Sequence, residues 1–141
     1  TSSDCNRTGQ GWNGRFILSS VHPTDWFSEK DDTLWQGVNG KNNPCPSGWR
    51  IPTQSEWQAE LDSWPADQKN YNGAFASPLK LTAAGGRYAS NGLVGNVSTF
   101  GYYWASSVDG TYAVDISFSS SSANMGVSSR ADGESVRCIK D

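Results

Sequence analysis

The chain has 141 residues, a formal net charge of −3 and only 18% charged residues. This length suits a single domain with a core, because a chain of this size buries roughly two-thirds of its unfolded surface. The acidic balance and the lack of a basic patch argue against nucleic acid as a partner, since phosphate binding needs clustered Lys and Arg. No apolar run approaches the ~20 residues that span a bilayer, so no transmembrane segment is predicted.

Aromatic rings supply much of the apolar mass. The chain has seven Trp, five Tyr and five Phe, and each large ring can bury roughly 150–250 Å². Gly, Ser, Thr and Asn are abundant, while Lys and Glu are few. This composition, together with three cysteines, is typical of exported proteins, in which disulfides persist. The chain starts at Thr1 without an initiator Met, which suits a processed mature protein or a cut piece. We therefore expect an extracellular or cell-surface location.

The first half of the chain is expected to be rich in loops. Residues 1–10 are polar and lack periodicity, which indicates an N-terminal arm ahead of a single domain over residues 11–141. Residues 15–18 predict a short strand before turn chemistry at His22. Residues 24–43 mix aromatic, acidic and Gly or Asn residues, and they predict an irregular segment pinned by its rings.

The clearest helix start is at Thr53. Thr53 and Glu56 fit a capping box, in which the hydroxyl accepts from the N3 amide and the Glu side chain reaches back. Pro65 is expected to end the helix, which gives about a dozen helical residues. Three apolar residues share one face of this helix and are expected to pack on the core: Trp57, Leu61 and Trp64.

In the second half of the chain, apolar and polar residues alternate with a period of two, as in β-strands. Residues 101–107 predict a strand by their aromatic content, and Asp109 followed by Gly110 is a strong hairpin signal. Met125 and Val127 indicate a further short strand. One helix followed by antiparallel strands predicts an α+β fold. The clearest alternation places Tyr112, Val114, Ile116 and Phe118 on a buried side and Ala113, Asp115, Ser117 and Ser119 on a solvent side.

Three stretches together resemble a known family. They are CPSGWRIPT at residues 45–53, followed by Glu56 and Trp57, GYYWASS at residues 101–107, and SVRCIKD at residues 135–141. This combination resembles the Fibrobacter succinogenes major paralogous domain. It also resembles the wider C-type-lectin-like fold, which includes formylglycine-generating enzymes and the variable ligand-binding proteins of diversity-generating retroelements. The resemblance covers residues 45–141. It implies a C-type-lectin-like fold, with one main helix and antiparallel strands, in an exported, surface-associated setting.

The resemblance also implies a disulfide between Cys45 and Cys138, because in that fold a Cys near the first long helix pairs with one in the last strand. A bond closing about 94 residues would restrict the unfolded chain by about 4–5 kcal/mol in the loop-entropy model. Two buried free thiols are the alternative. Cys5 is then left over, which suggests a bond to another chain or a free thiol. Pairing of Cys5 with one of the other cysteines would leave a different thiol free.

Ring-bearing side chains are the candidate contacts for a ligand or partner. Tyr102 and Trp104 share one face of the predicted strand, Tyr103 takes the other, and Tyr88 lies upstream. One face is expected to be core, and the other could stack on a sugar or contact a protein; packing alone is the alternative.

Two sequons are candidate N-glycosylation sites, at Asn6 and Asn96.

Other motifs favour structural roles. Residues 9–14 match the dinucleotide-binding pattern but follow a polar arm, so a Gly-rich turn is the better interpretation. His22 is the one His, which excludes a multi-His zinc site. We interpret Glu29, Asp31 and Asp32 as a solvated acidic loop instead of calcium ligands, so no metal and no cofactor are predicted.

The sequence thus predicts a secreted, non-enzymatic structural or adhesive surface module, such as a subunit of an extracellular fibre or cell-envelope appendage that self-associates. The N-terminal arm could add to the sheet edge of a neighbour. One alternative is a carbohydrate- or protein-binding lectin-like module that uses the loops between Gly86 and Ser107. Another is a formylglycine-generating-type oxidase, but those enzymes use an active Cys pair, which Cys5 alone does not supply.

Overall fold

The computed structural model describes residue 16, residues 18–19, 25–27 and 30–141. The predicted arm over residues 1–10, with Cys5 and Asn6, lies outside these residues, as do His22, Glu29 and the Gly-rich residues 9–14. Phe16 and Leu18, the described part of the strand predicted at 15–18, have no strand structure.

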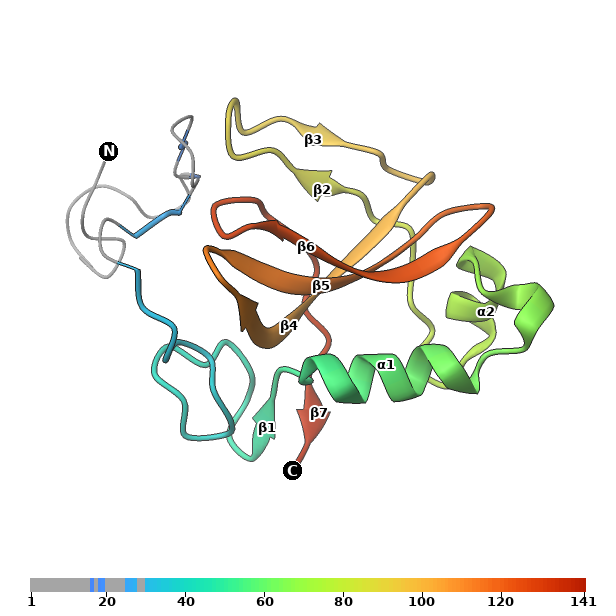
Figure 1. Ribbon diagram of the computed structural model, residues 1–141, viewed down its shortest axis with the longest axis horizontal. Helices are drawn as coiled ribbons and strands as arrows, with labels where there is room; N and C mark the ends of the chain where they lie inside the picture. Colours follow the sequence, from blue (N-terminus) through green and yellow to red (C-terminus); the bar gives the residue numbers. More distant parts are fainter. Residues whose placement is uncertain (1–15, 17, 20–24, 28–29) are drawn as a thin grey trace.

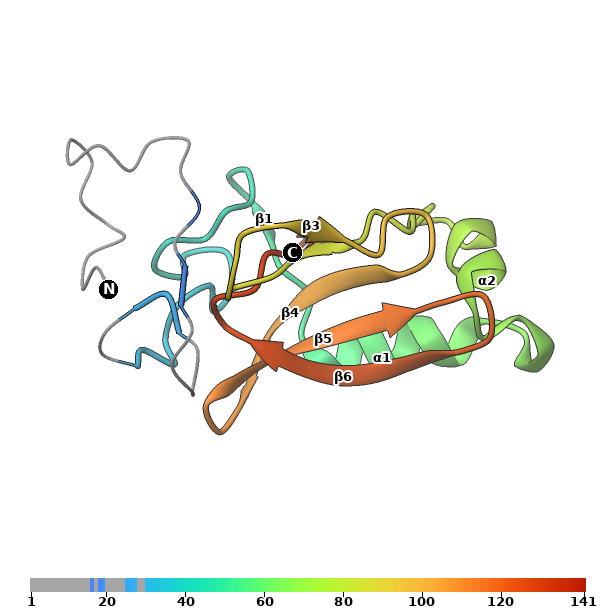
Figure 2. The same cartoon turned by 90° about the horizontal axis from the view of Figure 1, so that it is seen from above.

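A three-stranded antiparallel sheet forms the centre of the molecule (Figure 1). Its strands are β4 (Gly101–Asp109), β5 (Tyr112–Phe118) and β6 (Ala123–Ser129), in that order. The main helix, α1 (Gln54–Ser63), runs along one side of this sheet, as Figure 2 shows from above. The other named strands form two short antiparallel pairs: β2 (Gly86–Arg87) with β3 (Val94–Gly95), and β1 (Trp49–Arg50) with β7 (Ile139–Lys140). The α+β prediction is confirmed.

Helix α1 begins and ends where the sequence predicts. The amide of Glu56 donates to Thr53 Oγ1 over 3.3 Å, and the amide of Thr53 donates to Glu56 Oε2 over 2.8 Å. This reciprocal pair satisfies two amides that the first helical turn would otherwise leave unpaired. Helix α1 ends before Pro65. The predicted apolar face is buried, at Trp57, Leu61 and Trp64.

Stacked and tilted rings join the helix to the sheet. The ring of Tyr103 lies 6.1 Å from that of Trp57 and 6.0 Å from that of Phe118, measured between centroids. Trp64 meets Phe118 edge-on at 6.2 Å. The indole of Trp57 also donates to the Trp104 carbonyl over 3.1 Å. The core therefore consists of a few large rings whose polar atoms have partners.

Two local predictions need correction. The sequence predicted a single helix, but residues 71–76 form a second one, α2 (Tyr71–Ala76), whose first turn is capped by the side chain of Asn70. A 3₁₀ turn, η1 (Ala66–Gln68), links it to α1. A helix of six residues has too few turns for its apolar periodicity to be recognised in the sequence.

The second correction concerns the solvent side predicted for β5. Asp115 and Ser119 are buried, and only 2% of Asp115 is exposed. The chain after β6 returns beside β4, where Ser135 accepts from the Trp104 amide and donates to the Tyr102 carbonyl, both over 3.0 Å. This return adds a further extended segment to the edge of β4, and β2 continues it by pairing with Gly133. The side of β5 that was predicted to face solvent is therefore only partly exposed, with Ala113 and Ser117 half-buried.

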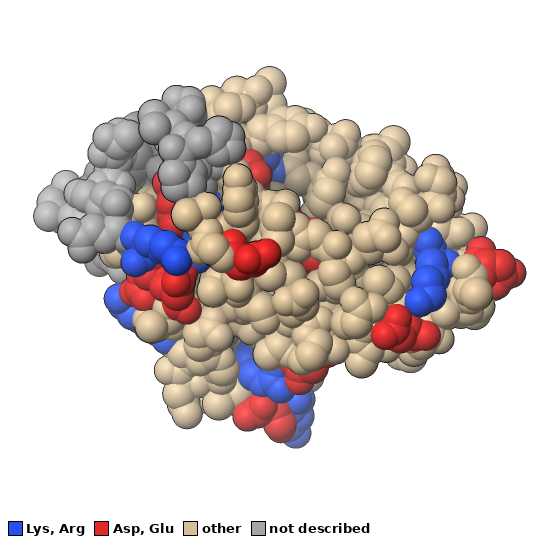
Figure 3. All heavy atoms as spheres, viewed as in Figure 1, with Lys and Arg blue, Asp and Glu red and all other residues tan. Residues whose placement is uncertain are grey.

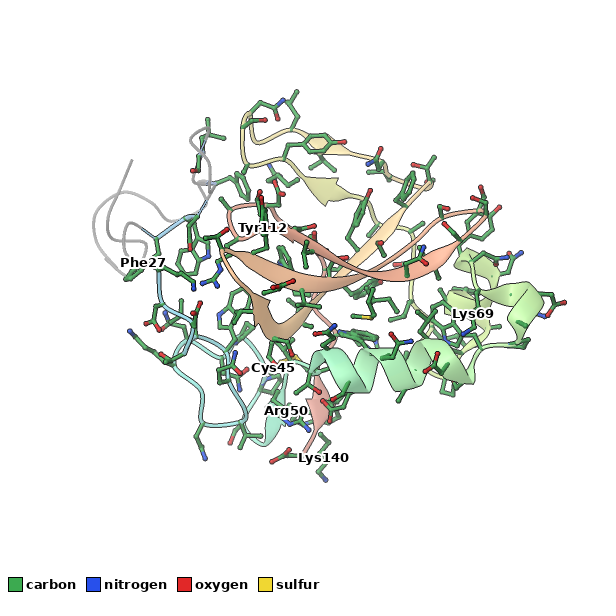
Figure 4. All side chains as sticks on the ribbon, viewed as in Figure 1. Phe27, Cys45, Arg50, Lys69, Tyr112 and Lys140 are labelled. Carbon is green, nitrogen blue, oxygen red and sulfur yellow. A yellow bond between two sulfur atoms is a disulfide. The ribbon has the colours of Figure 1, made fainter. Side chains whose placement is uncertain are left out.

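The segment that leads into α1 is fastened to the last residues of the chain. The disulfide between Cys45 and Cys138 is confirmed. Beside it, Arg50 on β1 donates two bonds of 2.7 Å to the Glu56 carboxylate, and its Nε donates to Asp141 Oδ1 over 2.7 Å. The hydrogen bonds from Arg50 lower the pKa of Glu56 to about 2. Figure 4 shows Cys45, Arg50 and Lys140 gathered at this end. No helix among the described residues is long and apolar enough to cross a membrane.

Replacement of both Cys45 and Cys138 by Ser should lower the free energy of unfolding by about 4–5 kcal/mol, because the open chain regains loop entropy. Urea unfolding monitored by Trp fluorescence measures this change. Cys5→Ser serves as the control, since it leaves this bond intact. A change below about 1 kcal/mol would show that the bond adds little to the non-covalent closure.

Candidate functional site

A cavity of about 160 Å³ opens between the β2–β3 hairpin, β4 and the segment that follows β6. Side chains from four parts of the chain line it, and most of them are polar or aromatic. They are Tyr88, Asn96, Tyr102, Ser128, Asp132 and Glu134. A concave site with convergent polar groups is the usual form of a ligand-binding pocket.

Two tyrosines form the aromatic side of the cavity. Tyr88 follows β2 and is 44% exposed, while Tyr102 lies on β4 and is partly buried. Phe100 stacks on the Tyr102 ring at 5.8 Å with an interplanar angle of 5°, and Asn96 Nδ2 donates to the Tyr102 hydroxyl over 3.1 Å. The Tyr88 ring packs directly on the backbone of Gly95. Any side chain at that position would clash with it, because a Cβ there would lie 2.7 Å from the phenol oxygen. Both rings are therefore positioned by their neighbours.

Two further carboxyls lie at or near the cavity: Glu134 lines it, whereas Asp115 does not line it but is close enough to act on Glu134. Asp115 projects from the central strand β5, and Ser128 Oγ donates to its Oδ2 over 2.9 Å. Gly126 is its register partner on β6, and the missing side chain leaves room for the carboxyl. Glu134 comes from the returning segment. Its Oε2 is fully buried and has no hydrogen-bond partner among the described residues.

Burial disfavours the charged forms of these acids. It raises the pKa of Glu134 to about 8, and the negative charges of Asp115 and Asp132 add to this effect, while the Ser128 hydroxyl opposes it. Burial also raises the pKa of Asp115. Burial is the main cause of the raised pKa of Tyr102. At neutral pH the cavity therefore holds a protonated Glu134 carboxyl.

The one cationic side chain along the cavity points away from these acids. Arg87 Nη1 donates to the Gly92 carbonyl over 2.6 Å, and the guanidinium lies over the Phe16 ring at 5.3 Å from its centroid. It does not figure among the charges that act on Glu134. Neither buried carboxyl has an ion-pair partner within the described chain.

The four predicted contact residues separate into different surroundings. Tyr88 and Tyr102 meet at the cavity. Tyr103 lies on the other face of β4 and belongs to the core, where its hydroxyl accepts from the Thr82 amide over 2.9 Å. Trp104 shares the face of Tyr102, as alternation predicts, but it is 4% exposed and borders a separate small cavity beside Trp35 and Arg130.

The described sequon lies at the mouth of the cavity. Asn96 is exposed and adopts a φ of 60°, and its Nδ2, the atom to which a glycan would be attached, bonds to Tyr102. A glycan at Asn96 would therefore stand over the opening.

The acidic loop is tied to basic side chains. Arg130 contacts Asp32 over 2.5 Å and Asp25 over 3.9 Å, and Lys41 contacts Asp31 over 2.9 Å. Hydrogen bonds from Thr33 and Lys41 lower the pKa of Asp31 to about 2. On the face of the molecule drawn in Figure 3, basic residues (blue) and acidic residues (red) lie next to each other, and no basic patch is visible. Among the described residues, no three His, Cys, Asp or Glu side chains gather as metal ligands.

Sequence reasoning missed the two buried carboxyls. Asp115 has a weak signal, as the one charged residue in an otherwise apolar and hydroxyl-bearing strand. Glu134 has none, because it lies in a short segment without periodicity between Gly133 and Ser135.

Comparison with known proteins adds no relative: no family model, curated protein or solved structure matches this chain.

Glu134→Gln should stabilise the protein as the pH rises. The folded pKa of Glu134 is about 8 against 4.5 for the free group, so the unfolded chain releases this proton first and stability falls between these values. We expect the amide variant to gain roughly 2–4 kcal/mol at pH 8 and almost nothing at pH 4.5.

Urea unfolding of both proteins at pH 4.5, 6 and 8 measures this difference. The control is Asp67→Asn, which removes an exposed carboxylate on η1. A difference between wild type and Glu134→Gln that does not change with pH would contradict the assignment.

Proposed function

We propose that the protein is an exported, non-enzymatic adhesive module with a C-type-lectin-like fold, which recognises a partner at a cell surface through the cavity between Tyr88 and Glu134. The partner presents either a carbohydrate or a protein side chain to this cavity. The observation that carries the proposal is the juxtaposition of two positioned tyrosine rings with the polar side chains of Asn96, Asp132 and Glu134 around one open cavity.

Several features support the fold assignment. The chain has one main helix packed on antiparallel strands, and the described residues 30–48 ahead of β1 form no named helix or strand. The disulfide joins a Cys just before that helix to one beside the last strand, as the family resemblance implies. A disulfide closing a long loop also favours an exported setting, because such bonds persist in oxidising compartments.

The surface around the cavity suits recognition. The β2–β3 hairpin and the loop after it expose Leu93, Val94, Val97 and Phe100 beside Tyr88, with exposed fractions between 38% and 64%. Contiguous exposed apolar side chains rimmed by polar groups mark binding surfaces in soluble proteins. Aromatic residues are also the side chains most often found at the energetic centre of interfaces.

An adhesive role fits better than catalysis. Cys45 and Cys138 are bonded to each other, so the oxidase alternative, which needs an active Cys pair, is left with Cys5 alone. Two carboxyl-bearing residues, Asp132 and Glu134, line the cavity. The lining residues include no nucleophilic side chain hydrogen-bonded to a general base.

Tyr88→Ala should reduce binding at least about tenfold, because it removes the exposed ring of the cavity. The assay is binding of labelled protein to intact cells of its source and to a glycan array, with and without calcium. Tyr71→Ala is the matched control, since Tyr71 is 39% exposed on α2 and does not line the cavity. Equal binding by both variants would exclude this cavity as the recognition site.

Self-association is a second candidate role, and the odd number of cysteines favours it. Three are present and two are bonded, which leaves Cys5 for a partner chain. On a non-reducing gel we expect a band at twice the monomer mass, which reductant and Cys5→Ser both remove. A monomer under both conditions would contradict covalent assembly.

A further inference from the structure

We propose that a groove beside β7 binds an extended acidic peptide segment of a partner protein, which adds a strand along residues 136–140 and pairs its carboxylates with Arg137 and Lys140. This site is distinct from the recognition cavity at Tyr88, because the two share no lining residue.

The groove combines apolar and basic side chains. It measures about 610 Å³, which lies within the range of ligand sites, and it borders the β1–β7 pair that projects from the body of the molecule (Figure 1). Trp49, Leu79 and Val136 give it an apolar surface, of which Trp49 and Val136 are each 39% exposed. Its charged lining residues are Arg137 and Lys140, and no Asp or Glu among the described residues lines it.

The two basic side chains have no partner within the described chain. Neither Arg137 nor Lys140 forms a side-chain hydrogen bond, an ion pair or a ring contact there. Asp141, the nearest acid in the sequence, is bonded to Arg50 instead. Every other basic side chain that the structure describes has a partner: Lys30, Lys41, Arg50, Lys69, Lys80, Arg87 and Arg130. The unpaired cations of the described chain therefore lie together at this groove, although the protein as a whole is acidic.

The outer edge of β7 has backbone groups that are available for pairing. The Asp141 amide donates to the Gly48 carbonyl over 3.3 Å, on the side of β1. Alternate residues of an antiparallel strand turn their N–H and C=O groups to opposite sides, so Ile139 also faces β1 and Lys140 faces away from it. No further strand of the described chain borders β7 on that outer side.

The chain ahead of β7 continues this free edge. Val136 and Cys138 precede Lys140 at intervals of two, and their backbone groups make no hydrogen bond to other parts of the described chain. Residues 136–138 form no turn or bend, and Val136 is exposed. Donors and acceptors thus recur at residues 136, 138 and 140, which is the spacing by which a peptide adds a strand to a sheet edge.

An acidic peptide fits both features of the groove. Its backbone would supply the amides and carbonyls that this edge lacks, and its carboxylates would pair with Arg137 and Lys140. A lipid or a simple anion would neutralise the two cations but leave the backbone edge unpaired. A basic peptide would bring like charges together.

Isothermal titration calorimetry of the full chain with a short peptide tests the site. The probe is acetyl-Thr-Glu-Val-Thr-Glu-Val-amide, in which the two Glu have the same spacing as Arg137 and Lys140. The same peptide with Gln in place of Glu should bind at least about tenfold more weakly, because it keeps the backbone but loses the charges. Octanedioate, a dicarboxylate without a peptide backbone, should also bind at least about tenfold more weakly. Raising the salt from about 0.05 to 0.5 M should weaken the Glu probe more than the Gln probe.

A charge reversal within the groove gives the first pair of variants. Val136→Glu places a negative charge beside the two cations and should weaken binding of the Glu probe at least about tenfold. The matched control is Val97→Glu, at a valine that is 56% exposed and lies outside the groove, and it should bind the probe like the wild type.

Removal of the cations gives the second pair. Arg137→Gln combined with Lys140→Gln should reduce the affinity for the Glu probe to that for the Gln probe, and the fold should persist because neither side chain has a partner in the described chain. Lys69→Gln combined with Lys80→Gln changes the net charge equally outside the groove and should leave binding unchanged.

Equal affinity for the Glu and Gln probes, equal affinity for octanedioate, or a Val136→Glu variant that binds like the wild type would each overturn the acidic-peptide site. Two further results would refute it by assigning the groove another occupant. One is sedimentation with phosphatidylglycerol vesicles, dependent on Arg137 and Lys140, without binding of the Glu probe. The other is tighter binding of a peptide of residues 1–10, which would point to a second copy of this chain.

Discussion

The covalent closure of Cys45 on Cys138 determines where the last part of the chain must run. Strand β6 ends at Ser129, and only eight residues separate it from Cys138, which is fastened beside the start of α1. The chain crosses this distance along β4, where Ser135 pairs with Tyr102 and Trp104, and Gly133 pairs with Arg87 of β2. That path carries Glu134 across the outer side of the sheet. The cavity is therefore a consequence of closing the chain.

The same closure is reinforced by one arginine that serves three elements. Arg50 lies on β1, bonds the Glu56 carboxylate near the start of α1 and bonds Asp141 at the other end of the chain. Glu56 also completes the capping box with Thr53. A single carboxylate thus joins local helix capping to a contact between distant segments, so the helix start and the chain closure support each other. The β2–β3 side of the molecule can then consist of loops and short strands, because the disulfide and Arg50 supply rigidity elsewhere.

Local interactions explain which parts of the fold could be predicted from the sequence. The capping box and the Asp109–Gly110 turn depend on residues a few positions apart, and both are present, whereas the alternation along β5 holds for Val114, Ile116 and Phe118 but fails at the exposed Tyr112 and the buried Asp115. Alternation also predicts that Tyr102 and Trp104 share a face. Alternation alone does not determine which of the two faces packs in the core. The core face is the one that carries Tyr103, because the Trp57 ring packs on it from a helix that is distant in the sequence. Asp115 and Glu134 meet only because the chain returns past β4, and no local pattern encodes that return.

The buried carboxyls are the point at which this sequence departs from what stability alone would favour. Asp115 occupies the centre of a three-stranded sheet, and Glu134 approaches it with a buried oxygen that finds no donor in the described chain. An amide at either position would fill the same space, supply donors and remove the repulsion between them. Other acidic side chains have ion-pair partners: Asp31, Asp32 and Glu56 are each bonded to a basic side chain. Sites where otherwise consistent rules are broken tend to be functional. The buried acids near Tyr102 are therefore better explained by a functional role than by the requirements of the fold.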